Sequence, residues 1–166
     1  MRKLLVVLCA AFLSSFVLTA AAQAADKFAY INLGQAFNEY SKTKEYDKNL
    51  TDKENSYTAE RDKKIKDLNS FRDKFTLLSD KEKEAKKGEL ENKAKVVKDF
   101  ITQKETELRK EQEDRMKEIL KDIESAVKTY AEKEGYTMVF NDRVLVYQDK
   151  TMDITDKIIA VLNKKR

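Results

Sequence analysis

The sequence predicts an α+β protein, mostly α, in which a long antiparallel helical hairpin projects from a small β-rich body. Residues 41–134 contain no proline and only one glycine, and their apolar residues recur at spacings of three and four. That periodicity places a narrow apolar stripe on an otherwise solvated helix. Short strand-like runs stand at 28–33 and 136–148. With 39% charged and 9% aromatic residues, the composition favours a helical rod over a thick globular core.

The N-terminal residues have the pattern of a secretory signal peptide. Two basic residues precede an apolar run at 4–18, and small residues up to Ala24 follow. We therefore predict cleavage between Ala24 and Ala25, which removes residues 1–24. The apolar run is too short for a lasting transmembrane helix. Because Cys9 is the single cysteine, the mature chain must be stabilised by packing or assembly instead of disulfides.

The first predicted element after the signal is a short strand. Residues 28–33 are apolar at both alternations, as in a strand buried on both faces. We expect Gly34 to end this strand and a brief helical turn, carrying Phe37, to reach Tyr40. Residues 25–40 then form the first part of the body.

Two long helices follow, predicted over 41–78 and 80–134. Between them, Ser79 and Glu82 have the spacing of a capping box, in which each side chain accepts from the other residue's backbone N–H. A new helix therefore starts near residue 80, and we predict that the pair folds back with its tip near 79–80. One long rod with an exposed turn is the alternative. Gly135 is expected to end the return helix.

The C-terminal residues 135–166 are predicted to form the second part of the body. Two strand-like runs at 136–140 and 144–148 are joined by Asn, Asp and Arg, a composition that favours a β-hairpin. Asp153 is expected to cap a final helix. One face of that helix carries Ile154, Ile158, Val161 and Leu162.

The two parts of the body hold roughly 50 residues, too few to bury an adequate core without disulfides or a metal. Short strands that are apolar on both faces also leave an open edge. We infer that strands from several chains close one shared sheet or barrel. The candidate residues of the shared core are Phe28, Tyr30, Ile31, Val139, Phe140, Val144 and Val146.

The residue inventory argues against catalysis. The chain has no histidine, and its three glycines stand alone, so no glycine-rich phosphate loop is present. Without histidine, and without cysteine once residues 1–24 are removed, the chain cannot form the nucleophile–base pairs that use these residues, or the usual zinc sites. Carboxylates are plentiful, but they lie on solvated helices where nothing raises a pKa. We expect no enzyme activity, no cofactor and no metal.

The predicted tip gathers lysines around apolar residues. Phe71 and Phe75 share a face with Ile65 and Leu68, so we assign them to the helix–helix interface. The remaining residues either keep the tip soluble or form a cationic, partly apolar contact for an anionic or amphipathic partner. These candidate contact residues are Lys74, Leu77, Lys81, Lys83, Lys86 and Lys87.

Several stretches of the sequence resemble the Skp/OmpH family of periplasmic chaperones. They are the Ala-Asp-Lys start at 25–27, the strand at 28–33, the Tyr-Thr-Met-Val-Phe and Val-Leu-Val-Tyr runs from 136 to 147, and Asp-Ile-Thr at 153–155. The resemblance is specific over 25–40 and 135–163, whereas the hairpin agrees in architecture only. It implies a homotrimer with a small β-barrel hub and three helical arms around a cavity. It also implies that unfolded outer-membrane β-barrel proteins are held there without ATP.

The leading hypothesis is therefore an ATP-independent periplasmic holdase that keeps such proteins from aggregating. One alternative is a structural coiled coil that bridges envelope layers. Another is a protein that binds lipopolysaccharide, another polyanion or an anionic membrane surface through the basic tip. Nucleic acid is not an expected partner, because the chain carries an export signal.

Overall fold

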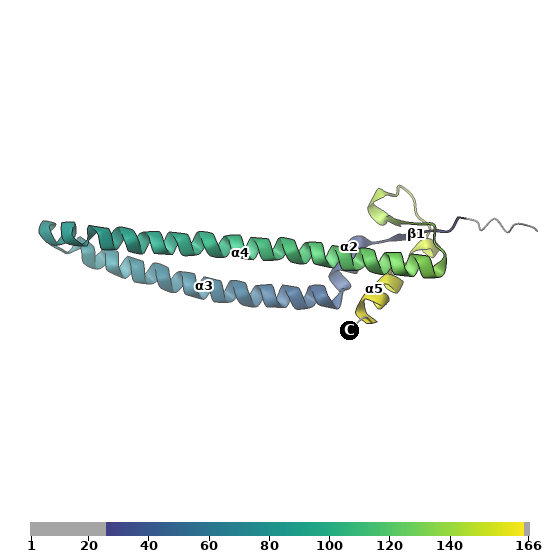
Figure 1. Cartoon of the computed structure of the whole chain (residues 1–166), viewed down its shortest axis with the longest axis horizontal. Coiled ribbons are helices and arrows are strands. Elements are labelled where there is room, and N and C mark those ends of the chain that lie inside the picture. Colours follow the sequence, from purple (N-terminus) through teal and green to yellow (C-terminus); the bar gives the residue numbers. More distant parts are fainter. Residues whose placement is uncertain (1–25, 165–166) are drawn as a thin grey trace, which may run out of the picture.

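The computed structural model describes residues 26–164, and the predicted signal peptide lies outside them. Figure 1 shows two long helices side by side that leave a small α/β body at one end. The helices are α3 (Ser41–Thr76) and α4 (Asp80–Glu134). Within the described residues, no helix is both long and apolar enough to cross a membrane.

The turn between α3 and α4 is built as the sequence predicts. The backbone N–H of Ser79 donates to the Glu82 carboxylate at 3.0 Å, and the capping box starts α4 at Asp80. Hydrogen bonds from the Ser79 side chain and backbone lower the pKa of Glu82. At the far end of α4, Gly135 adopts φ 72°, which favours glycine. The hairpin, not the single rod, is the observed arrangement.

The apolar stripe forms the interface between the two helices, but it is thin. Leu68 and Ile119 are buried in it, whereas most of the other predicted members are half-buried. The spacing of three and four also predicts Met116, three residues before Ile119, as a member of the stripe, but Met116 is 48% exposed and this prediction is wrong. Arg115 is half-buried in the neighbouring position. An arginine can occupy such a position because its stem packs along apolar surface while its guanidinium finds polar partners.

The body is built on a two-stranded parallel sheet. β1 (Phe28–Ile31) pairs with β2 (Met138–Asn141), with Phe28 opposite Met138. On its other side, β1 forms a single bridge from Tyr30 to Asp153. β1 leads into α2 (Leu33–Glu39), where Asn32 Oδ1 accepts from the Gln35 N–H at 2.8 Å. The helix therefore starts one residue before Gly34, which lies in its first turn.

The prediction of a β-hairpin over 136–148 is wrong, because the described residues do not form it. After β2, the side chain of Asn141 accepts from the Arg143 N–H and starts the 3-10 turn η1 (Asp142–Val144). Residues 145–149 have no regular structure and lead to a second 3-10 turn, η2 (Lys150–Met152). The hydrogen bond to the Asn141 side chain thus gives the backbone an alternative to the hydrogen bonds of a β-ladder. Among residues 26–164, no strand lies beside 144–148 to hold them extended.

The final helix, α5 (Thr155–Lys164), closes the body. As predicted, Asp153 accepts from the Thr155 N–H at 2.8 Å. The hydroxyl of Thr155 in turn accepts from the Asn32 N–H at 2.8 Å, so α5 and α2 start from one shared cap. The core beneath them contains, among others, Ile31, Ile119, Ile123, Ile154, Ile158 and Leu162.

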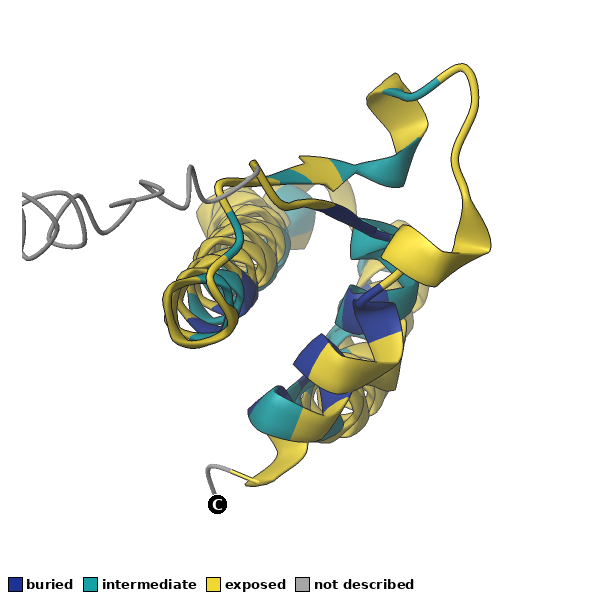
Figure 2. Cartoon of the chain, turned by 90° about the vertical axis from the view of Figure 1, so that its right-hand side faces the viewer, coloured by how far each residue is buried: buried dark blue, intermediate teal, exposed yellow. Residues whose placement is uncertain are grey.

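The end of α4 supplies part of this core, because Ile119, Ile123 and Ala126 are all buried in it. The return helix therefore continues past its partner and packs on the body, as its greater predicted length requires. Figure 2 shows the buried residues where β1, α5 and the helices meet, whereas the segment between β2 and α5 is exposed. The chain thus has a small core of its own and one uncovered side.

Candidate functional site

The uncovered side of the body carries apolar residues that no part of the described chain covers. Val144 is 69% exposed and Val146 is 107% exposed, relative to an unfolded reference. We call this surface the body patch, and it consists of Phe28, Met138, Phe140, Val144, Val146 and Tyr147. The Phe28 and Phe140 rings lie 6.3 Å apart within it. An apolar surface of this kind marks an interaction site on a soluble protein.

The body patch adjoins an open sheet edge. β1 has β2 on one side and the Asp153 bridge on the other. The outer edge of β2 has no strand partner among residues 26–164. Unpaired backbone N–H and C=O groups beside exposed apolar side chains form a template for another strand.

The candidate residues of the shared core fall into two groups. Phe28, Phe140, Val144 and Val146 belong to the body patch. Of the other three, Ile31 is buried in the core of its own chain and Val139 packs against it. Tyr30 is also buried, but it lies on the opposite face of the sheet, opposite Phe140 in the strand register. Alternation along a strand sends neighbours to opposite faces, and the sequence did not show which face the chain itself covers.

The tip residues lie together at the far end of the hairpin. Leu77 is 87% exposed, and four of the five lysines are exposed, Lys83 being half-buried. None of these five lysines forms an ion pair within the described residues. Their charges are therefore directed to solvent, where an anionic partner can reach them.

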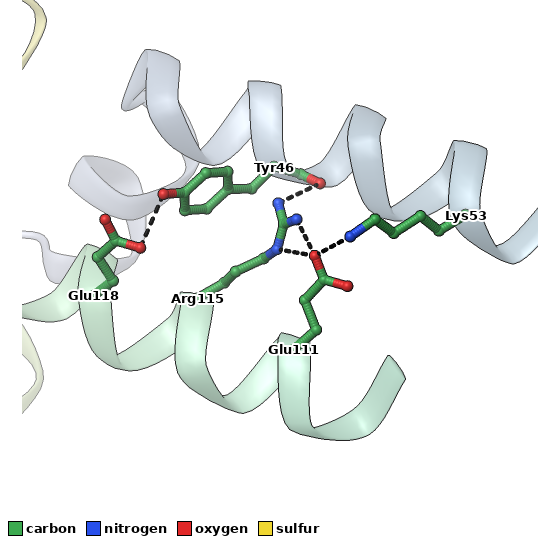
Figure 3. A network of polar contacts seen from close by, with 5 residues as sticks. All are labelled: Tyr46, Lys53, Glu111, Arg115 and Glu118. Carbon is green, nitrogen blue, oxygen red and sulfur yellow. Dashed lines mark hydrogen bonds and ion pairs between the residues drawn. The ribbon is translucent and has the colours of Figure 1, made fainter. Parts of the chain in front are cut away.

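The base of the hairpin holds a polar network that the sequence reading missed (Figure 3). Tyr46 donates its hydroxyl hydrogen to Glu118 at 2.8 Å, and Lys53 Nζ lies 2.5 Å from Glu111 Oε1. Arg115 pairs with Glu111 and places its guanidinium carbon 4.4 Å from the Tyr46 ring centroid. The spacing of Arg115 four residues after Glu111 predicts an ion pair on one helix face. Many such pairs occur along this chain, so the spacing does not single this one out.

The charges of this network follow from its hydrogen bonds. We call it the root network, and it consists of Lys42, Tyr46, Lys53, Glu111, Arg115, Glu118 and Asp122. Bonds from Lys53 and Arg115 lower the pKa of Glu111. Bonds from Lys42 and Tyr46 lower the pKa of Glu118. Both carboxylates stay ionised at neutral pH, and the network fixes α3 against α4 where the arm leaves the body.

The fold and these surfaces define a class of protein with a two-helix arm on a small α/β body. The chain belongs to the family of OmpH-like outer membrane proteins, which it matches over residues 27–162. The resemblance to the Skp/OmpH family is thereby confirmed. No curated protein matches the sequence significantly.

The fold also has a counterpart among solved structures. A proposed outer membrane chaperone (OmpH-like) from Caulobacter crescentus superposes with a TM-score of 0.77. The match covers 86% of this chain and 87% of that chain at 14% sequence identity. Similarity at this identity establishes the shared fold of arm and body.

Proposed function

We propose that this protein is an ATP-independent periplasmic holdase chaperone. In this proposal it binds unfolded outer-membrane β-barrel proteins between helical arms and keeps them from aggregating before insertion. Membership of the OmpH-like family supports a chaperone role. The chain lacks a glycine-rich phosphate loop, which agrees with release that needs no nucleotide.

The observation that carries the proposal is the free-standing arm. Every residue packed in or against the body core lies before residue 47 or after residue 118. The remaining part of α3 projects for about 45 Å at 1.5 Å per residue. Two helices that contact only each other expose a long charged surface with scattered apolar residues. Such a surface suits weak contacts at many points along an unfolded chain.

Assembly would turn single arms into a cavity. We propose a homotrimer in which the body patch and the open edge of β2 from each chain close a shared β-barrel hub. The fully exposed Val146 and the unpaired β2 edge support an intermolecular partner at this place. In this arrangement the body comprises 25–40 and 135–166, and each hairpin, 41–134, projects from the hub.

A dilution experiment tests the function. An unfolded outer-membrane β-barrel protein is diluted from denaturant with and without the mature chain, and turbidity and complex mass are followed. We expect clear solutions and a complex of three chains with one client, with no nucleotide added. Undiminished turbidity at a threefold chain excess would contradict the proposal and favour a purely structural coiled coil.

A second candidate function is polyanion binding at the tip, with lipopolysaccharide or an anionic membrane surface as partner. The unpaired tip lysines favour it. Vesicles with and without anionic lipid distinguish it from client binding, because retention on anionic vesicles requires no unfolded protein.

A further inference from the structure

Two open grooves lie between α3 and α4 along the arm. The proximal groove, of about 470 Å³, is lined by residues that include Lys53, Ser56, Tyr57, Lys104, Glu107 and Leu108. The distal groove, of about 330 Å³, lies nearer the tip. Its lining includes Lys64, Asp67, Leu68, Lys93, Val96 and Val97.

The two grooves lie at equivalent positions along the arm, although most of the side chains at these positions differ. On α3, Lys53, Ser56 and Tyr57 stand eleven residues before Lys64, Asp67 and Leu68. On α4, which runs in the opposite direction, Lys104, Glu107 and Leu108 stand eleven residues after Lys93, Val96 and Val97. Eleven residues make close to three helical turns, so equivalent positions face the same side. The grooves therefore share one face of the arm and lie about 16 Å apart.

The same eleven-residue step toward the body leads to the root network. Lys42 and Tyr46 precede Lys53 and Tyr57 by eleven residues, and Arg115 is equivalent to Lys104. At this position the Arg115 guanidinium packs on the Tyr46 ring, and Lys42 Nζ lies 2.6 Å from Glu118 Oε1. Cross-helix polar contacts thus fill the first repeat, whereas the next two repeats are open grooves, the proximal one with the Lys53–Glu111 ion pair in its lining.

The lining of both grooves combines an apolar floor with a charged rim. In the distal groove, Val96 is 52% exposed beside the buried Leu68. In the proximal groove, Leu108 and the ring of Tyr57 line the floor. Ion pairs such as Lys104 with Glu107, at 2.7 Å, stand at the rim. This combination accepts an apolar side chain on the floor and polar or charged neighbours at the rim.

We propose that the two grooves are paired subsites for apolar and aromatic side chains of one extended, unfolded chain. The proposal rests on the proposed function and assigns the grooved face of the arm as the client-contact face. An extended chain advances about 3.3 Å per residue, so side chains at i and i+4 or i+6 are about 13 or 20 Å apart. These spacings bracket the distance between the grooves, whereas side chains at i and i+5 point to opposite faces of an extended chain and cannot both enter grooves on one face of the arm. Transmembrane β-strands carry apolar residues at alternate positions, which supplies such pairs repeatedly.

The test uses synthetic peptides with alternating apolar and polar residues. One peptide has tryptophan at positions i and i+6, a second has it at i and i+5, and a third has a single tryptophan. Because the protein has no tryptophan, emission excited at wavelengths that tyrosine does not absorb reports the peptide alone. We expect the i, i+6 peptide to bind the mature full-length protein about tenfold more tightly than the single-tryptophan peptide, since two linked contacts reinforce one another.

Matched variants locate the binding. Val96→Gln makes the distal groove polar, and we expect it to remove most of the tenfold gain. Leu120→Gln is the control, because Leu120 is also an exposed apolar residue of α4 but lines neither groove. Circular dichroism and sedimentation verify that both variants keep fold and assembly. Equal affinity for the i, i+5 and i, i+6 peptides, or equal losses in the two variants, would overturn the proposal.

Turbidity assays with an unfolded β-barrel protein distinguish a failure of the groove assignment from a failure of the proposed holdase function. If the wild type suppresses aggregation but Val96→Gln binds every peptide normally, the grooves are not the subsites and the holdase function stands. If the wild type does not suppress aggregation, the proposed function fails. An arm-to-arm association that appears without peptide and is abolished by Val96→Gln would assign the grooves to a second copy of the chain and overturn the client assignment.

Discussion

The ammonium group of Lys42 lies 2.7 Å from Asp122 Oδ2, which joins the first turn of α3 to the last third of α4. The same group lies 2.6 Å from Glu118 Oε1. Hydrogen bonds to Asp122 and Glu118 raise the pKa of Lys42 well above its ordinary value of 10.5. The Tyr40 hydroxyl also donates to Asp122, at 3.2 Å. The point where the arm leaves the body is thus held by charge-assisted contacts above a thin apolar interface.

Replacing Lys42 with Met should loosen this junction. The change removes two ion pairs and leaves two carboxylates facing each other, so we expect the free energy of unfolding to fall by about 1 kcal/mol. Urea denaturation measures the change. Lys95→Met is the control, because its pair with Asp99 is on the exposed surface of one helix and should change stability by less than about 0.5 kcal/mol. Equal losses in both variants would show that the junction has no special role.

The root network should make stability depend on pH on the acid side. The pKa values of Glu111 and Glu118 are lowered in the folded chain. Their stabilising contribution is therefore present above the ordinary pKa of 4.5 and is lost as the pH falls through the lowered values. We expect thermal melting curves recorded from pH 6 to pH 3 to show a steeper loss in the wild type than in Glu118→Gln. Parallel curves for the two proteins would contradict this assignment.

Assembly should depend on the body patch. Val146 is fully exposed in the single chain, so Val146→Asp disturbs no intrachain packing but places a charge in the proposed shared hub. We expect sedimentation to show monomers that retain their helical circular dichroism. Thr151→Asp, on the exposed segment before α5, is the control and should remain trimeric. A trimeric Val146→Asp protein would rule out this arrangement.

The tip lysines should govern how fast clients are captured. Changing Lys81, Lys83, Lys86 and Lys87 to Gln removes the charge while nearly preserving length and helix propensity. We expect an unchanged trimer with slower capture and a weaker dependence on salt between low ionic strength and about 0.15 M, where exposed charges are already partly screened. Stopped-flow measurements with a labelled client provide the rates. If rate and salt slope match those of the wild type, the lysines serve solubility alone.

The sequence by itself determined the elements whose signals are local. The Ser79–Glu82 capping box, Gly135 at the end of α4 and Asp153 before α5 each act within a few residues, and each has the predicted role. The stripe of apolar residues likewise follows from helical periodicity. These features depend on neighbours within one or two turns, so the order of residues is enough to specify them.

The tertiary structure decided what depends on distant partners. The parallel pairing of Phe28 with Met138 joins segments more than 100 residues apart, and no local pattern distinguishes it from the predicted antiparallel hairpin. The equivalence of the two grooves is also invisible in the sequence, because it appears only when α3 and α4 lie antiparallel and their eleven-residue steps coincide. Whether Ile31 faces its own core and Val146 faces outward follows from which surfaces the rest of the chain covers, and periodicity within a strand cannot fix that.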